Sequence, residues 1–278
     1  MVIPFPRISP VAISIGPLAV RWYGLMYVLG YVAGSSLAKL RSRRGLWTLT
    51  IADVDALVGY LLAGMFLGAR LVYVLVYDWP NYRAHPLEII AVWHGGLSFH
   101  GAAAGMALAC VAFAWRHRVP WLMVTDGLAV CAPPGLLFGR LGNFINGELY
   151  GRPTTVPWAM VFPTDPARQP RHPSQIYEAL GEGIVLGAAL WSLQRLLARR
   201  GAATGVFHDG YLSAAFLIGY GIIRFLVEFT RQPDAQLGLI VGPLSMGQLL
   251  SILMIAAGGA LGVVARRYPA SHPGKFAH

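Results

Sequence analysis

The sequence has few charged residues and few cysteines for its length. Of its 278 residues, 12% are Asp, Glu, Lys or Arg, whereas 56% are hydrophobic. Soluble domains carry about a quarter charged residues, so this composition excludes a soluble globular enzyme and a disordered chain. Its two cysteines, Cys110 and Cys131, exclude a disulfide framework and a cysteine-rich metal site. The composition is typical of a protein that crosses a membrane several times.

The common catalytic and metal-binding motifs are also missing. The chain has no HExxH motif, no paired-carboxylate metal site and no GxSG serine motif, and His94, His117, His208 and His278 lack ligand-like spacing. We therefore expect neither a metal nor a cofactor. The net charge of +10 would suggest nucleic acid in a soluble protein. Here the basic residues are explained by membrane topology, and no nucleic-acid partner is expected.

Long apolar runs dominate the chain. A membrane-spanning helix needs about 20 mostly apolar residues. Seven stretches qualify, namely 15–38, 54–77, 97–115, 122–142, 174–194, 206–227 and 244–264. They predict one all-α integral-membrane domain over residues 1–278, with seven transmembrane helices and a retained first span. The only long loop expected is 143–173, which holds six prolines and predicts a small ordered cap.

The basic residues predict the orientation of these spans, because Lys and Arg favour cytoplasmic loops. One side of the predicted bundle carries twelve: Lys39, Arg41, Arg43, Arg44, Arg116, Arg118, Arg195, Arg199, Arg200, Arg266, Arg267 and Lys275. The other side carries seven: Arg7, Arg21, Arg83, Arg152, Arg168, Arg171 and Arg231. We therefore expect the N-terminus and the cap outside, in the periplasm, and the C-terminus in the cytoplasm.

Glycines four residues apart recur in the spans, as in Gly64/Gly68 and Gly101/Gly105. Small residues at this spacing let helix backbones approach closely in lipid. The spacing therefore predicts tight helix packing.

Several polar side chains fall inside the apolar spans. Arg70, Arg140 and Arg224 are intramembrane arginines, and His100 and Tyr23 lie at a similar predicted depth, in the outer half. An intramembrane Arg usually faces a cavity or a partner, and its planar fork of donors suits a phosphate. The pattern indicates a polar cavity that binds phosphate, although snorkelling or a structural ion pair would explain any single arginine.

Six sequence blocks resemble the prolipoprotein diacylglyceryl transferases of bacteria. The most specific is GRLGNFINGELYGR at 139–152. The others follow in the family's order: RWYGLMY at 21–27, GGLSFHG at 95–101, RHPSQIYE at 171–178, GYGIIRFLVEFTRQPDAQ at 219–236 and SMGQLLS at 245–251. The resemblance covers about residues 15–255. One departure is a short segment between Phe162 and Arg171, which affects only the expected shape of the cap.

The resemblance implies an activity and its partners. Such enzymes act in the bacterial inner membrane, with the active site toward the periplasm. They transfer the diacylglyceryl group of phosphatidylglycerol to the lipobox cysteine of a prolipoprotein signal peptide, forming a thioether and releasing glycerol phosphate. The family's essential histidine falls on His100 and its essential arginines on Arg140 and Arg224. The lipid-binding set implied by the motif matches comprises Tyr23, Arg140, Asn143, Asn146, Glu148, Gly151, Tyr220 and Arg224.

The chemistry leaves several roles open. Arg140 and Arg224 would stabilise charge on the departing phosphate. His100, with an ordinary pKa near 6.5, is the expected general base, unless it only hydrogen-bonds the lipid. Tyr23 and Tyr220 would line the lipid site or belong to an aromatic belt.

The signature residues Asn143, Asn146 and Glu148 are expected to position the cap or the headgroup. Glu228, Arg231 and Asp234 are expected to form a structural ion network. The alternative function is a flippase or scramblase of anionic phospholipid. It would need a polar path to the inner leaflet, where the spans offer only Asp53, Asp55 and Asp126 near their inner ends.

Overall fold

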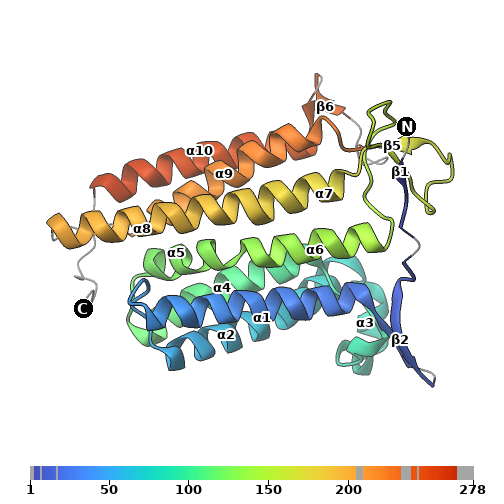
Figure 1. The fold of residues 1–278 in the computed structure, drawn as a ribbon. Coiled ribbons are helices and arrows are strands. Elements are labelled where there is room, and N and C mark those ends of the chain that lie inside the picture. Colours follow the sequence, from blue (N-terminus) through green and yellow to red (C-terminus); the bar gives the residue numbers. More distant parts are fainter. Residues whose placement is uncertain are drawn as a thin grey trace.

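The computed structural model describes residues 3–6, 8–16, 18–204, 209–232, 239–242 and 244–267. It is an elongated bundle whose long helices run roughly along one axis (Figure 1). The helices of the bundle are α1 (Trp22–Arg43), α2 (Ile51–Val72), α4 (Phe99–His117), α5 (Trp121–Cys131), α6 (Pro133–Ile145), α7 (Ser174–Glu178), α8 (Leu186–Thr204), α9 (Tyr211–Glu228) and α10 (Met246–Arg267). Two π-helical segments continue helices, η1 (Tyr73–Tyr77) after α2 and η4 (Ala179–Val185) between α7 and α8. Arg7, His208, Asp234, Lys275 and His278 lie outside the described residues.

Several helices are long and apolar enough to cross a membrane. Four such stretches are Ile51–Tyr77, Ser174–Gly201, Tyr211–Glu228 and Met246–Arg267. Helices α5 and α6 meet at a bend of 41° and together have the length and composition of a fifth. Helices α1 and α4 lie in the same bundle (Figure 1). The chain is therefore a mostly helical, multi-pass membrane protein, whereas the count of seven spans stays a prediction.

The predicted start of the first span, residue 15, is wrong. Strands β2 (Val11–Ile15) and β3 (Leu18–Arg21) pair as an antiparallel hairpin, and α1 begins only at Trp22. Gly16 has φ of +57°, the left-handed conformation that a tight turn requires. Apolar composition alone does not distinguish a strand from a helix, so the apolar run before Trp22 is compatible with either element.

The remaining short elements gather at the same end of the bundle as this hairpin (Figure 1), called the β end below. They are β1 (Ile3–Pro4), α3 (Trp79–Ala84), η2 (Pro86–Ile89), η3 (Val92–His94), β4 (Met160–Val161), β5 (Pro170–Arg171), β6 (Leu239–Val241) and β7 (Leu244–Ser245). Strand β4 pairs in parallel with β1 and antiparallel with β5, so residues 146–173 form an ordered structure.

A second long connection, residues 78–98, joins η1 to α4 through α3 and two 3₁₀ turns, so 143–173 is not the only long loop. This connection is organised by Arg70. Its guanidinium donates hydrogen bonds to backbone carbonyls of the connection, including those of Ile89 (2.8 Å) and Gly95 (2.6 Å). The Tyr82 ring packs against this guanidinium, with Arg70 Cζ 5.0 Å from the ring centroid. Arg70 is therefore a structural residue that satisfies loop carbonyls, a role that differs from the phosphate site, the snorkelling and the ion pair considered for it in the sequence.

The predicted tight glycine packing is confirmed between α2 and α4. A Cβ atom added at Gly64 or Gly68 would collide with the backbone of Gly105 or Gly101, and the reverse also holds. The two helix backbones thus touch without intervening side chains, as small residues permit in membrane helices.

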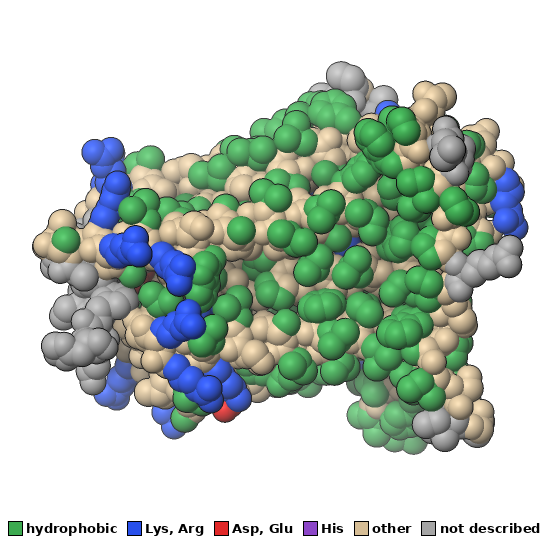
Figure 2. Space-filling view, in the orientation of Figure 1, with side chains coloured by type: hydrophobic (Ala, Val, Ile, Leu, Met, Phe, Trp, Pro, Cys, Tyr) green, Lys and Arg blue, Asp and Glu red, His purple; other side chains and the backbone are tan. Residues whose placement is uncertain are grey.

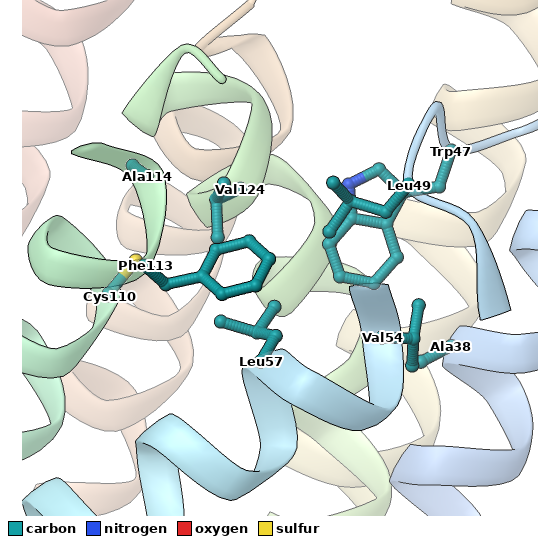
Figure 3. Close-up of a cluster of buried hydrophobic side chains, with 9 residues drawn as sticks. All are labelled: Ala38, Trp47, Leu49, Val54, Leu57, Cys110, Phe113, Ala114 and Val124. Atoms are coloured by element: carbon teal, nitrogen blue, oxygen red, sulfur yellow. The ribbon is translucent and has the colours of Figure 1, made fainter. Parts of the chain in front are cut away.

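Lys and Arg side chains gather at the end of the bundle opposite the β end (Figure 2), called the basic end below. Next to it lies a buried apolar cluster around Phe113, Val124 and Leu57 (Figure 3). Arg41, one of the arginines assigned to the cytoplasmic side, is buried within the bundle. Arg41 is 1% exposed and donates to Gln194 Oε1 (3.0 Å) and the Gly127 carbonyl (2.5 Å). It therefore links α1 to α5 and α8 and does not face solvent.

Candidate active site

Arg140 and Arg224 meet at a buried carboxylate. Arg140 lies near the end of α6 and Arg224 near the end of α9, both toward the β end (Figure 1). Between them lies Glu178, the last residue of α7, with Oε2 3.0 Å from Arg140 Nε and Oε1 3.4 Å from Arg224 Nη1. The two guanidinium groups, 84 positions apart in the sequence, are thus neighbours.

A second carboxylate, Glu182, lies on the next turn of the same helix. Its Oε2 accepts from Nε and Nη2 of Arg140, each at 3.4 Å. The side chains of Glu178 and Glu182 are completely buried. Glu178 directly precedes the π-helical segment η4 and Glu182 lies within it, where Gly183 packs on Leu137 of α6. π-Helical turns inside α-helices occur frequently at functional sites.

The ion network extends to the end of α9. Arg231 Nη1 lies 3.0 Å from Glu178 Oε1, and Glu228 Oε2 lies 2.5 Å from Arg224 Nη1. Ser245 donates to Glu228 Oε1 at 2.8 Å, tying the start of α10 to the network. The predicted pairing of Glu228 with Arg231 is confirmed at 3.7 Å.

We call these six residues the ion cluster; they are Arg140, Glu178, Glu182, Arg224, Glu228 and Arg231. Three arginines face three glutamates, so the cluster is neutral when all are ionised. Sequence reasoning missed Glu178 and Glu182 as site residues. Two glutamates four positions apart in an apolar span share one helix face, and that spacing is a signal that would have found them.

The arginines keep donors available for a ligand. The Arg140 and Arg224 side chains are 18% and 16% exposed. Among the described residues, Arg140 Nη1 and Arg224 Nη2 carry no hydrogen bond. Since each guanidinium has five N–H donors, the pair can still bind an anion.

The signature residues that follow Arg140 are hydrogen-bonded to one another. Asn143 and Asn146 donate from Nδ2 to Glu148 Oε1, at 2.9 and 3.3 Å. The Glu148 carbonyl accepts from Gln175 Nε2 at 2.5 Å, which joins this loop to α7. Gly151 packs against the Thr230 carbonyl so closely that a Cβ would not fit. These residues therefore fix the loop after α6 against the helices that carry the ion cluster.

Two predicted tyrosines lie close to this region. A Cβ at Gly142 would lie 2.9 Å from Tyr23 Cδ2, so the Tyr23 ring packs directly on α6. The Tyr23 hydroxyl hydrogen-bonds that of Tyr27 at 3.0 Å. Tyr220 is half-buried on α9, one turn before Arg224, and interacts electrostatically with Arg140. Both positions fit a lining role, which stays a prediction.

His100 makes its hydrogen bond outside the ion cluster. It is the second residue of α4, is exposed, and its Nδ1 lies 3.4 Å from the Tyr77 hydroxyl, at the end of η1. In the part of the chain that the structure describes, no hydrogen bond or ion pair joins His100 to Arg140 or Arg224. All three residues lie toward the β end, but the single shared pocket expected from the sequence stays a prediction.

The segment 146–173 is held by a buried ion pair. Arg171 donates to both oxygens of Asp165, at 2.6 and 3.0 Å, and its guanidinium lies over the Tyr150 ring. These hydrogen bonds lower the pKa of Asp165 below its usual range. Burial lowers the pKa of the neighbouring His172. The pair therefore keeps β5 in place beside the start of α7.

A cavity of about 700 Å³ lies at the other end of the molecule. It is lined by Arg41, Trp47, Asp126, Gln194 and other residues near the basic end. In the part of the chain that the structure describes, no three or more His, Cys, Asp or Glu side chains are grouped so that they could hold a metal ion. The cavity is remote from the ion cluster, and we do not assign the chemistry to it.

Comparison with known proteins places the chain in a family. The family model for prolipoprotein diacylglyceryl transferase matches residues 10–264. A phosphatidylglycerol–prolipoprotein diacylglyceryl transferase of Bordetella bronchiseptica is 50% identical over 266 residues, covering 95% of this chain and 98% of the relative. Relatives of the same name from Nitrosomonas europaea (50% identity, 95% and 92% coverage) and Azospirillum brasilense (46%, 98% and 99%) agree. The resemblance found in the sequence is confirmed, and the chain belongs to the prolipoprotein diacylglyceryl transferase family.

Proposed function

We propose that this protein transfers the diacylglyceryl group of phosphatidylglycerol to the lipobox cysteine of a prolipoprotein. The observation that carries the proposal is the pair of guanidinium groups joined through Glu178, each with donors left for an anion. The relatives named for this reaction match the chain over nearly its full length.

The reaction forms a bond between the substrate's sulfur and a glyceryl carbon and breaks the bond from that carbon to the phosphate oxygen. Glycerol phosphate leaves with the electron pair, so negative charge grows on the phosphate as the bond breaks. Arg140 and Arg224 would stabilise that charge more in the transition state than in the ground state. The nucleophile comes from the peptide, which explains why the protein needs no cysteine in the ion cluster.

The thiol proton needs an acceptor, and His100 is our proposed general base. Transfer from a thiol of pKa about 8.5 to an imidazole of about 6.5 costs about 2.7 kcal/mol. The contact with Tyr77 supports a base role, because a hydroxyl hydrogen bond at Nδ1 orients the ring. For the base role, the peptide thiol must bind between His100 and the arginines.

The basic end supports the orientation. Positive charge favours the cytoplasmic side, so in the proposed orientation the β end, the ion cluster and His100 face the periplasmic side of the inner membrane. Large exposed apolar side chains on the connection 78–98 agree with a location at the membrane surface: Leu87, Ile90, Trp93 and Leu97. The proposal retains seven spans, with α1 and α4 crossing beside the more apolar helices.

The test is a transfer assay with the purified protein, phosphatidylglycerol vesicles and a lipobox peptide. We expect a mass gain on the peptide cysteine. Arg140→Lys and Arg224→Lys should each lower the rate by about 100-fold, because one bidentate donor pair is lost. Arg83→Lys, an exposed arginine at the same end, is the control. Movement of lipid between leaflets without a peptide adduct would instead support a flippase.

A further inference from the structure

Glu182 is an unexpected residue for a site that binds an anion. It is completely buried, and among the described residues it forms an ion pair with Arg140 alone. In the described part of the chain, its Oε1 is buried without a hydrogen-bond partner. Burying a carboxylate is costly unless the charge is well compensated. Packing alone therefore does not account for a glutamate at this position.

Glu178 and Glu182 differ in which arginines they contact. Glu178 contacts Arg140, Arg224 and Arg231, so it fixes the spacing of the three guanidinium groups. In the part of the chain that the structure describes, Glu182 accepts hydrogen bonds only from Arg140, at 3.4 Å from both Nε and Nη2. Its charge therefore acts chiefly on Arg140. It contacts the Nε and Nη2 edge of the guanidinium and leaves Nη1 unpaired among the described residues.

The charge of the ion cluster matters differently for substrate and product. Phosphatidylglycerol is a phosphodiester with one negative charge, whereas glycerol phosphate is a monoester with nearly two at neutral pH, since its second pKa is about 6. A cluster of three arginines and two glutamates would carry a net positive charge. It would bind the product more strongly than the substrate and slow its release.

We propose that Glu182 is a positioning residue that orients Arg140 and offsets its charge, so that glycerol phosphate is released after transfer. This inference rests on the proposed function. It deepens that function by naming the residue that sets the balance between lipid binding and product release.

The test compares the wild-type protein with Glu182→Gln, which keeps the shape and an acceptor oxygen but removes the charge. With an effective dielectric of about 40 and a separation of about 9 Å, one charge changes binding of a monoanion about fivefold and of a dianion about 25-fold. We expect the KM for phosphatidylglycerol to fall about fivefold, the inhibition constant of glycerol phosphate to fall about 25-fold, and kcat to fall about tenfold.

The matched control is Glu88→Gln, which makes the same chemical change on an exposed side chain at the β end. Solvent and salt screen that charge, so its constants should equal those of the wild type. An unchanged or raised inhibition constant in Glu182→Gln would overturn the proposal, because a purely structural defect would weaken binding of both anions.

A second variant keeps the test decisive if Glu182→Gln does not fold. Glu182→Asp retains the charge but reaches less far toward Arg140, so kcat should fall while the inhibition constant stays within about twofold. A 25-fold drop in that constant would contradict the charge argument. If the wild-type protein formed no peptide adduct, the proposed function would fail. Calorimetric titration of glycerol phosphate into wild type and variant would then still decide the role of Glu182.

Discussion

The contact between α2 and α4 offers a sharp test of the packing. In Gly64→Ala, the new Cβ would lie 2.6 Å from Ala109 Cβ and 3.0 Å from the Gly105 carbonyl carbon. Carbon atoms pack at about 3.5–4.0 Å, so the helices must separate by about 1 Å. Gly59→Ala, in the same helix, is the matched control, because its Cβ would meet nothing within 4 Å.

The magnitudes of the two substitutions follow from this geometry. Overpacking costs about 1–3 kcal/mol, and the better helix propensity of Ala returns about 1 kcal/mol. We therefore expect Gly64→Ala to lower the free energy of unfolding by about 1 kcal/mol and Gly59→Ala to raise it by up to about 1 kcal/mol. At about 2–4 °C per kcal/mol, their melting temperatures should differ by about 4–8 °C.

The assay is thermal unfolding of the purified proteins in the same detergent, followed by helical circular dichroism. Transfer activity is measured in parallel, since α4 carries His100 at its first turn and a shifted helix would disturb the contact with Tyr77. If Gly64→Ala and Gly59→Ala melted together, the close backbone contact and the reasoning built on it would be refuted.

The remaining predictions concern the proposed base and the segment 146–173. His100→Gln should lower transfer by about 100-fold or more, and Tyr77→Phe by about tenfold through loss of ring orientation; near-normal transfer by a folded His100→Gln protein would rule out the base role. The hydrogen bonds from Arg171 lower the folded-state pKa of Asp165. Its stabilising contribution is therefore complete above the ordinary carboxyl pKa of about 3.8 and is lost as pH falls through the lower folded value. Asp165→Asn should therefore melt at a lower temperature than the wild type at pH 7, and this difference in melting temperature should shrink at low pH. A difference in melting temperature that stayed the same at every pH would contradict this role of Asp165.

Much of the fold followed from the sequence because membrane helices leave a strong compositional signal. A run of about 20 apolar residues can be recognised in one sequence without relatives, and the helices α2, α9 and α10 lie where such runs predict them. The hairpin of β2 and β3 leaves no such signal, because short strands and the ends of helices are built from the same apolar residues. Which of them forms depends on the turn at Gly16 and on pairing partners.

The candidate site divides in the same way. Motif matches identified Arg140, Arg224 and the signature loop, since a single Arg in an apolar span is unusual wherever it occurs. The partners of these arginines were not predicted. Arg70, which also lies in an apolar span, satisfies loop carbonyls. Arg41, predicted among the basic residues of the cytoplasmic side, is buried.

The sequence by itself determined that the chain is a helical membrane protein of this family, because hydrophobicity and motif residues are properties of the linear chain. Only the tertiary structure decided what each charge does, because an ion pair depends on which helices lie side by side. Glu178 acquires three arginine neighbours when α6, α7 and α9 converge. That convergence brings scattered polar residues into one ion cluster, whose remaining donors are available for the proposed phosphate ligand.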